Sequence, residues 1–510
     1  GEYNLDAGGS LRIGENTRVL TGINYFNYDV PTDNNGDNFT DVTLQDRISV
    51  FQKWNFTRDS SREFSLAGRF FYEDRWGGEM QWTPEFRGTD SIYGESIYTR
   101  RWELLGRYQL PLPEKLLLSV SYNDHRQDSW YGDLPYLADQ RIGFGQLSWD
   151  KTAGNHDLLV GAALRYNYYD DNTPATDSPQ GNDPDRVWIP SLFAQDEYRF
   201  SGKHTLLAGL RYDQDPRHGS IWTPRGAVKL QLGEHELLRL NFGTGFRVVN
   251  LFTEDHAALT GARDVVIAED LLPEQSWNLN LNYLRKFYTP DGHFFSVDAS
   301  AFYTDFSNQI LPDYDSDPNR IFYRNLDGRS VSRGFSLNLD AAFANGLRVA
   351  AGTTLQDVRV DAEGTNSRPV LTERYSATWS VSFPIRPLQL TADYTGNLYG
   401  PMRLPLAGDL DPRPEYSPAW SIQNIQFTFK GLEHMEIYAG VKNLLNWTPN
   451  RGTPFLIARA GDPFDKQVQF DASGDPVPSE GNPYGLTFDP AYVYGPNQGI
   501  RGFAGLRYQL

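Results

Sequence analysis

The sequence predicts an all-β fold, a transmembrane antiparallel β-barrel, and three observations lead to that class. Apolar side chains recur at every second position in many segments, short polar turns alternate with long polar loops, and no long apolar run occurs. The even-numbered positions of 158–168 are all apolar or aromatic, and so are the odd-numbered positions of 435–441. Successive side chains of a strand point to opposite faces, so this period of two predicts strands with one apolar face.

Composition excludes several classes of protein. The 510 residues include no cysteine, so this sequence has no disulfide framework, no thiolate metal site and no cysteine nucleophile. Asp and Glu number 65 against 47 Lys and Arg, and the formal charge of −18 argues against a nucleic-acid surface. The aliphatic runs, such as 116–118, are very short beside the ~20 apolar residues that a transmembrane helix needs.

The connections between the expected strands differ in length on the two sides of the sheet. Short turns carry Gly, Asn or Asp, as at 14–16, 153–155 and 290–292, whereas the intervening loops are long and polar. Lipid offers the backbone no hydrogen bonds, so strands cross it only as a closed sheet, with the long loops on one side. We expect about 21 strands in a single barrel domain over 1–510. The expected long loops lie near 29–41, 76–93, 129–136, 171–186, 214–219, 247–270, 306–329, 359–371, 399–416 and 448–494.

The number and direction of these strands lead to an expectation about the chain ahead of Gly1. Single-chain bacterial barrels have an even strand number, with both chain ends on the short-turn side. The first connection, near 13–16, is short, so the strand that begins at Glu2 runs from the long-loop side. We therefore expect a barrel of the 22-stranded type whose first strand precedes Gly1, and an N-terminal plug domain that fills its wide lumen.

The stretch 236–283 carries two sequence signatures around a long loop. A strand closes on Gly-Phe-Arg, and a Leu-x-Pro-Glu-x-Ser signature opens the return strand. This arrangement resembles TonB-dependent outer-membrane receptors, and the end of the chain, 494–510, is similar to the Bacteroidota type of that family. The motif positions of the family fall on Gly245, Phe246, Arg247, Glu254, Leu271, Pro273, Glu274 and Ser276.

The resemblance implies an integral protein of the Gram-negative outer membrane, surrounded by the lipid bilayer and lipopolysaccharide. Its external loops would bind a scarce solute, and the TonB–ExbB–ExbD complex would act on the expected plug so that the solute enters the periplasm. No cofactor is required. An iron–siderophore complex is the leading substrate, and cobalamin, haem, another metal and an oligosaccharide are the alternatives. Two alternatives belong to a different functional class: a passive pore, and a surface scaffold that docks partner proteins.

External aromatic and cationic side chains are the candidates for ligand binding. Such side chains hold a metal chelate or an organic ring by stacking and by cation–π contact. The alternatives are that they pack the loops together or form the aromatic belt at the lipid interface. The candidates are Trp76, Trp82, Trp130, Tyr131, Arg247, His256 and Arg263.

Two external loops suggest further contacts. In the loop 33–41, Asp33, Asn35, Asp37 and Asp41 offer oxygen ligands that suit a structural Ca²⁺, although position 38 lacks the Gly of an EF-hand loop. A flexible, solvated acidic loop is the alternative. The longest loop, 448–494, is rich in Asp, Pro, Gly and aromatic residues, and it is a candidate lid or docking surface for a surface lipoprotein.

No catalytic arrangement is recognisable in the sequence. None of the 8 histidines belongs to a His-Glu-x-x-His pair, and no serine lies in a Gly-x-Ser-x-Gly elbow. We therefore predict that the protein is not an enzyme and that no residue is catalytic.

Overall fold

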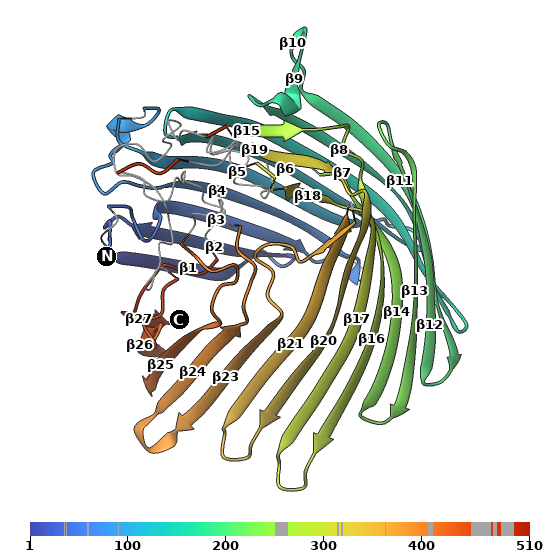
Figure 1. The fold of residues 1–510 in the computed structure, drawn as a ribbon. Coiled ribbons are helices and arrows are strands. Elements are labelled where there is room, and N and C mark those ends of the chain that lie inside the picture. The colour runs from blue at the N-terminus through green and yellow to red at the C-terminus, as the bar shows by residue number, and fades with distance from the viewer. Residues whose placement is uncertain are drawn as a thin grey trace.

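The computed structural model describes residues 1–510 except 35, 37, 59–60, 90, 250–263, 314–315, 318–319, 363, 406–411, 450–470, 473–476, 481–493 and 510. The chain forms one large curved sheet around a central lumen, as Figure 1 shows. Within the described part of the chain this sheet contains 22 strands, of which β22 has only three residues. The 21 long strands that remain match the number predicted from the sequence.

Each long strand pairs antiparallel with the next long strand of the chain. The strands of the main sheet are β1 (Glu2–Ile13), β2 (Thr17–Tyr28), β3 (Leu44–Phe56), β4 (Phe64–Gly78), β5 (Gly94–Gln109), β6 (Lys115–Tyr131), β7 (Leu134–Ala153), β8 (His156–Asp171), β11 (Asp185–Ser201), β12 (His204–Asp215), β13 (Gly219–Gly233), β14 (Glu236–Arg247), β16 (Glu274–Tyr288), β17 (Phe294–Asn308), β20 (Gly328–Ala342), β21 (Arg348–Ala362), β22 (Thr365–Ser367), β23 (Tyr375–Ile385), β24 (Leu390–Tyr399), β25 (Trp420–Leu432), β26 (Met435–Lys442) and β27 (Arg501–Tyr508).

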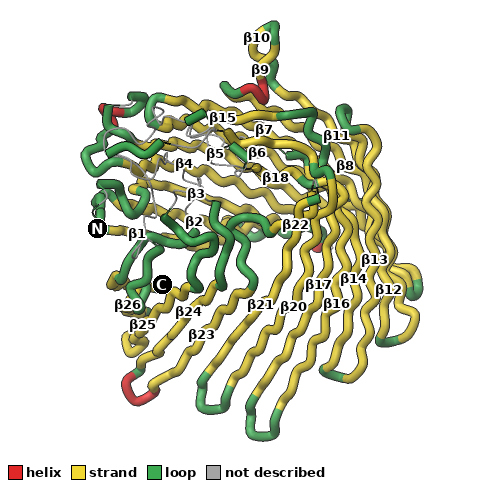
Figure 2. Tube along the Cα trace, viewed as in Figure 1, coloured by secondary structure: helices red, strands yellow, loops and turns green. Residues whose placement is uncertain are grey.

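The connections carry the remaining short elements. Figure 2 shows that strands make up most of the trace and that the helical turns are brief. In the described part of the chain, no helix combines the length and the apolar character needed to cross a bilayer. The elements in the connections are η2 (Pro84–Phe86), η3 (Pro174–Thr176), η5 (Arg386–Leu388), the hairpin of β9 (Asp177–Ser178) and β10 (Gly181–Asn182), and a separate sheet of β15 (Asp264–Ile267), β18 (Ile310–Asp313) and β19 (Arg320–Asn325).

The two faces of the main sheet differ in polarity because side chains alternate along each strand. In the neighbouring strands β14 and β16, Leu240 lies opposite Leu281 and Phe242 lies opposite Leu279, and all four are 40–44% exposed. Position 241, between them, places an asparagine on the other face. An apolar outer face with a polar lumen is the pattern of a barrel embedded in lipid.

Some connections at the long-loop end are shorter than the sequence indicates. Only Gly132 and Asp133 join β6 to β7, with Tyr131 paired to Leu134 and Gly132 at φ 60°, a conformation that glycine adopts without strain. The prediction of a long loop at 129–136 is therefore wrong, and so is that at 214–219, where β13 begins only four residues after β12 ends. A strand end that projects beyond the apolar band has the polar composition of a loop, which explains the difference.

The first and last strands of the sheet begin side by side. The Arg501 guanidinium of β27 lies 3.8 Å from the Glu2 carboxylate of β1. Among the described residues, β1 is hydrogen-bonded only to β2, and β27 only to β26. Both strands run from the long-loop end to the short-turn end, so antiparallel closure between them requires a strand of the opposite direction.

Candidate functional site

A small sheet lies at the long-loop end of the barrel. The loop between β14 and β16 supplies β15, and the loop between β17 and β20 supplies β18 and β19. β15 pairs in parallel with β19, while β18 pairs with β19 as an antiparallel hairpin. We call β15, β18 and β19 the loop sheet. Figure 1 shows it near the ends of β5, β6 and β7, strands that are distant from β17 in the order of the barrel.

A hydrophobic cluster fixes the loop sheet to that far wall. Ile310, Ile321 and Tyr323 of the loop sheet pack with Ile97 of β5, Tyr131 of β6 and Tyr136 of β7. Ile321 is 0% exposed and Tyr323 is 1% exposed. Burying a side chain of this size contributes about 1.5–3 kcal/mol relative to leaving it in water. The loop sheet therefore extends from its own strands across the mouth to the opposite wall.

The predicted signature residues meet where this loop sheet leaves the wall. Gly245 pairs with Ser276 and Arg247 pairs with Glu274 across β14 and β16. The Arg247 Nε donates to Glu274 Oε2 at 2.8 Å, and the Ile310 backbone N–H donates to Glu274 Oε1 at 2.9 Å. The Glu274 side chain is only 9% exposed. Glu274 thus joins two barrel strands to β18 of the loop sheet. The fourth signature position, Glu254, lies outside the described residues.

Two asparagines add a second connection beside Glu274. Asn308 Nδ2 donates to the carbonyl oxygens of Leu272 at 3.2 Å and Pro273 at 3.1 Å. Asn325 Oδ1 accepts from the Leu272 backbone N–H at 2.8 Å, and Asn325 Nδ2 donates to the Asp270 carbonyl at 2.9 Å. Both ends of the β18–β19 segment are therefore tied to the residues that precede β16.

The predicted ligand-binding aromatics fall into two separate groups. Trp76 and Trp82 are in ring contact, with centroids 4.7 Å apart, and Trp82 is buried in the connection between β4 and β5. Arg87 of the same connection lies 6.0 Å from the ring centre of Trp130. Tyr131, the next residue of β6, points to the opposite face and belongs to the cluster under the loop sheet.

Other predicted ligand contacts are placed differently. Arg247 is engaged by Glu274, with an Nη2–Oε2 distance of 2.7 Å, and its side chain is more than half exposed. His256 and Arg263 lie outside the described residues. The structure does not bring the five described candidates into one site, and the role of all seven in ligand binding stays a prediction.

The acidic loop 33–41 uses its carboxylates in local hydrogen bonds. Asp33 accepts from the backbone N–H groups of Gly36 at 2.7 Å and Asn38 at 2.9 Å. Asp41 accepts from the backbone N–H of Asn34 at 2.7 Å. Asn35 and Asp37 lie outside the described residues, and within the described ranges no group of three or more His, Asp or Glu side chains could hold a metal ion. Calcium binding at this loop stays a prediction.

The inner wall of β2 to β5 carries arginines beside aromatic rings. Arg69 and Phe71 lie on the face of β4 opposite to the exposed Leu66 and Tyr72, and therefore face the lumen. The guanidinium carbons of Arg69 and Arg101 lie 5.5 Å and 5.7 Å from the Phe71 ring centre. We call this group, with Arg47 at 5.2 Å from the Phe26 ring, the inner arginine wall. A surface of this kind suits an anionic ligand with aromatic rings.

Sequence reasoning missed the loop sheet and the inner arginine wall. A signal for β19 was present, because Ile321 and Tyr323 alternate with Phe322 and Arg324 inside the expected loop 306–329. The inner arginine wall required the strand register, which brings Arg101 beside Phe71 across two strands. No short-range pattern in the sequence identifies such a pair.

The geometry defines a class of protein, a lipid-embedded barrel whose mouth is crossed by its own loops. The model of the family described as TonB dependent receptor-like, beta-barrel matches residues 3–444, and the chain belongs to this family of outer-membrane transport receptors. The predicted fold class, an antiparallel membrane barrel of about 21 strands in this sequence, is confirmed. No curated protein matches the sequence.

Solved structures share the fold at low sequence identity. The ferric enterobactin receptor PfeA of Pseudomonas aeruginosa aligns with a TM-score of 0.69 and 15% identity over 99% of this chain and 78% of its own. The siderophore receptor PirA of Acinetobacter baumannii aligns with a TM-score of 0.67 and 14% identity over 99% and 77%. The ferric-catecholate import receptor Fiu of Escherichia coli aligns with a TM-score of 0.62 and 11% identity over 88% and 77%.

Proposed function

We propose that this chain is the barrel of a TonB-dependent active transporter that imports an iron–siderophore complex. The observation that carries the proposal is the loop sheet, which crosses the mouth of the barrel. It is held by Glu274 on one side and by the hydrophobic cluster with Tyr131 on the other. A covered mouth suits a receptor that holds its solute and releases it inward on demand. The similar structures named as siderophore receptors support the choice of solute.

The inner arginine wall supplies the chemistry for such a solute. Ferric siderophores with catecholate groups are anionic and carry aromatic rings, and guanidinium groups beside Phe71 offer both charge and stacking. Glu103 lies between Arg69 and Arg101, at 3.6 Å and 3.2 Å, so the local charge remains positive. The protein changes no bond in the solute under this proposal, and no catalytic residue is assigned.

The binding test uses the full-length receptor and iron-55 complexes of catecholate and hydroxamate siderophores. Arg101→Gln removes one charge-assisted contact of about 1.5 kcal/mol, so we expect catecholate affinity to fall about tenfold. Arg348→Gln, at the short-turn end of β21, is the matched control and should bind normally. Absence of binding for every siderophore, with binding of cobalamin, haem, another metal or an oligosaccharide, would reassign the substrate.

A passive pore and a surface scaffold are the alternatives from another class. A passive pore predicts steady conductance when the full-length protein is placed in a planar bilayer. A scaffold predicts copurification with a partner and unchanged solute uptake on deletion. If the protein is a gated transporter, the planar bilayer should show no steady current, and deletion of the gene should reduce solute uptake.

We further propose that a plug domain and a segment that contacts TonB–ExbB–ExbD complete the transporter. The same direction of β1 and β27, each bonded on one side in the described part of the chain, favours one more strand between them. The intact mass of the protein isolated from its native membrane tests this proposal. The same proposal includes a surface lipoprotein that binds the loop 448–494, most of which lies outside the described residues. It also includes the Bacteroidota type of the receptor. Both parts are based on the sequence alone.

A further inference from the structure

A group of arginines lies on the outer surface of β20 and β21 and directly after β22, just above the apolar band. Phe335 of β20 and Leu355 of β21 lie opposite each other, and both are exposed on the outer face. Two residues farther toward the long loops on that face, Arg333 lies opposite Asp357. Two residues advance a strand by about 6.8 Å, so these charges stand at the upper edge of the band.

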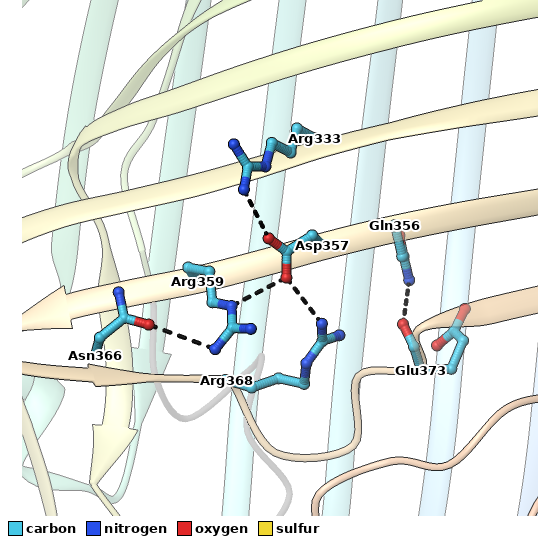
Figure 3. Close-up of polar contacts among 7 residues, drawn as sticks. All are labelled: Arg333, Gln356, Asp357, Arg359, Asn366, Arg368 and Glu373. Atoms are coloured by element: carbon cyan, nitrogen blue, oxygen red, sulfur yellow. Dashed lines mark hydrogen bonds and ion pairs between the residues drawn. The ribbon is translucent and has the colours of Figure 1, made fainter.

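Four guanidinium groups lie here with three carboxylates, those of Asp305, Asp357 and Asp361, so the group has one positive charge in excess. Arg333 Nη2 lies 3.1 Å from Asp357 Oδ2, while Arg359 Nε and Arg368 Nη2 each donate to Asp357 Oδ1 at 3.0 Å. Figure 3 shows the three arginines converging on this one carboxylate. Arg329 Nε donates to Asp305 Oδ2 at 2.6 Å. We call Arg329, Arg333, Arg359 and Arg368 the outer arginine patch.

The patch keeps hydrogen-bonding capacity for a further anion. The side chains of Arg329 and Arg333 are 60% and 63% exposed. Arg368 is 4% exposed at its side chain, yet its Nε and Nη1 have no hydrogen-bond partner within the described residues. These two atoms are shielded from solvent, so the N–H groups that an anion from outside can reach are those of Arg329 and Arg333.

A surface hollow of about 240 Å³ lies at the same place. Its lining includes the arginines Arg329, Arg333 and Arg359, the carboxylates Asp357 and Asp361, and the polar side chains Tyr303 and Asn366. The hollow opens on the outer wall of the barrel, because Tyr303 and Arg333 are paired neighbours on the outer face of β17 and β20. A ligand in this hollow would therefore come from the membrane side and not from the lumen.

The outer wall of β3 and β4 carries the opposite charge at the corresponding place, whereas the outward-facing Arg126 and Arg141 of β6 and β7 lie beside Asp139 and Asp124. On β3 and β4, Ile48 lies opposite Tyr72 on the exposed face, and the next outward pair toward the long loops is Asp46 with Asp74. The whole sequence carries a formal charge of −18, so general attraction cannot draw an anion to the barrel. A local basic patch above the apolar band is the feature that favours anionic headgroups.

We propose that the outer arginine patch binds a phosphate of a phosphorylated glycolipid in the outer leaflet, the lipid A part of lipopolysaccharide. Guanidinium groups bind phosphate oxygens in pairs of parallel hydrogen bonds. The height of the patch matches the headgroup layer that lies above the Phe335–Leu355 pair. The inference rests on the outer-membrane placement of the family and is independent of which solute is transported.

The test is native mass spectrometry of the full-length protein, extracted mildly and titrated with purified lipid A carrying two phosphates. The variant combines Arg333→Gln with Arg359→Gln, and the matched control combines Arg126→Gln with Arg141→Gln, outward-facing arginines of β6 and β7. We expect the variant to retain the glycolipid at least about tenfold less than the parent protein, since two charge-assisted contacts are lost. The control should retain it normally.

Further arms separate the other outcomes. Equal retention by the variant and the parent would overturn the proposal, as would equal loss in the variant and the control. Binding of inorganic phosphate that displaces lipid A at equal concentration would assign the patch to a free anion. Arg333→Lys with Arg359→Lys keeps the charge but not the planar fork, and intermediate retention is expected. We expect these variants to bind the siderophore normally. If the parent protein binds no siderophore, that result contradicts the transport proposal and leaves the lipid site untouched.

Discussion

At the scale of the residue, Glu274 connects the barrel wall to the loop sheet. Its Oε2 accepts from Arg247 on the neighbouring strand, and its Oε1 accepts from the backbone of Ile310. A carboxylate that is largely shielded from water and satisfied on both oxygens holds two chain segments in one geometry. The glutamate of the Leu-x-Pro-Glu-x-Ser signature therefore has a structural role at the mouth.

Glu274→Gln retains the size of this side chain and removes its charge. We expect the loop sheet to open more often, with a loss on the order of 1–3 kcal/mol, toward the lower end because Arg247 is partly solvated. Hydrogen exchange of the amides in 310–313 and 320–325, measured by mass spectrometry, should become faster. Exchange in the wall strand β20 should stay the same.

Glu236→Gln is the matched control for this change. Glu236 lies at the other end of β14, near the short turns, where its carboxylate accepts from the Tyr283 hydroxyl at 2.6 Å. We expect normal exchange in the loop sheet for this variant. Equal protection in the parent and in Glu274→Gln would show that the carboxylate does not hold the loop sheet.

At the scale of the element, β19 is the strand on which the covered mouth depends. Its two faces differ, because Ile321 and Tyr323 are buried in the hydrophobic cluster with Tyr131, whereas Phe322 is only partly buried on the other face. The partners Tyr131 and Tyr136 come from β6 and β7, far away in the sequence. The position of β19 is thus set by tertiary packing and not by its own strand propensity.

Tyr323→Ala should release β19 from the wall. Removal of a buried aromatic side chain costs about 3–5 kcal/mol in packing, which is enough to unfasten a six-residue strand without unfolding the barrel. Limited proteolysis should then cut within 306–329, while the barrel keeps its heat-modifiable mobility on a gel. Phe322→Ala on the opposite face should remain resistant, and equal cutting of both variants would contradict the packing.

The elements divide into those that sequence reasoning can predict and those that it cannot. Barrel strands such as 158–168 repeat an apolar outer face at every second position, so their presence and number follow from the sequence. The six residues of β19 lie among Asp, Asn and Pro, and the signal is too short to stand out. The tight turn at Gly132 was expected as a loop, because β6 and β7 continue as polar strands beyond the apolar band.

The site divides in the same way. The signature on β14 and β16 is contiguous enough in the sequence to indicate Arg247 and Glu274, and the structure joins these two side chains. The inner arginine wall and the outer arginine patch depend on register across strands, which places Arg333 opposite Asp357. Neighbours of that kind are 24 residues apart in the chain, and no short-range pattern indicates them.

At the scale of the whole molecule, the two faces of one sheet meet two different solvents. Leu339 of β20 is exposed on the outer face, and the preceding Asn338 faces the lumen. Leu339→Arg should cost about 2–4 kcal/mol of folding free energy in lipid vesicles, whereas Asn338→Arg should cost far less. Urea unfolding of the two refolded proteins measures the difference. Equal costs would mean that the outer face is not in contact with lipid.

The central claim is that this barrel transports an iron–siderophore complex by energised gating, and uptake of iron-55 siderophore by whole cells tests it most directly. The cells express the full-length gene in a background that lacks other siderophore receptors, with TonB either active or deleted. We predict saturable uptake that requires active TonB, while surface binding persists without TonB. Uptake that is not saturable and continues unchanged without TonB would contradict the claim and identify a passive pore.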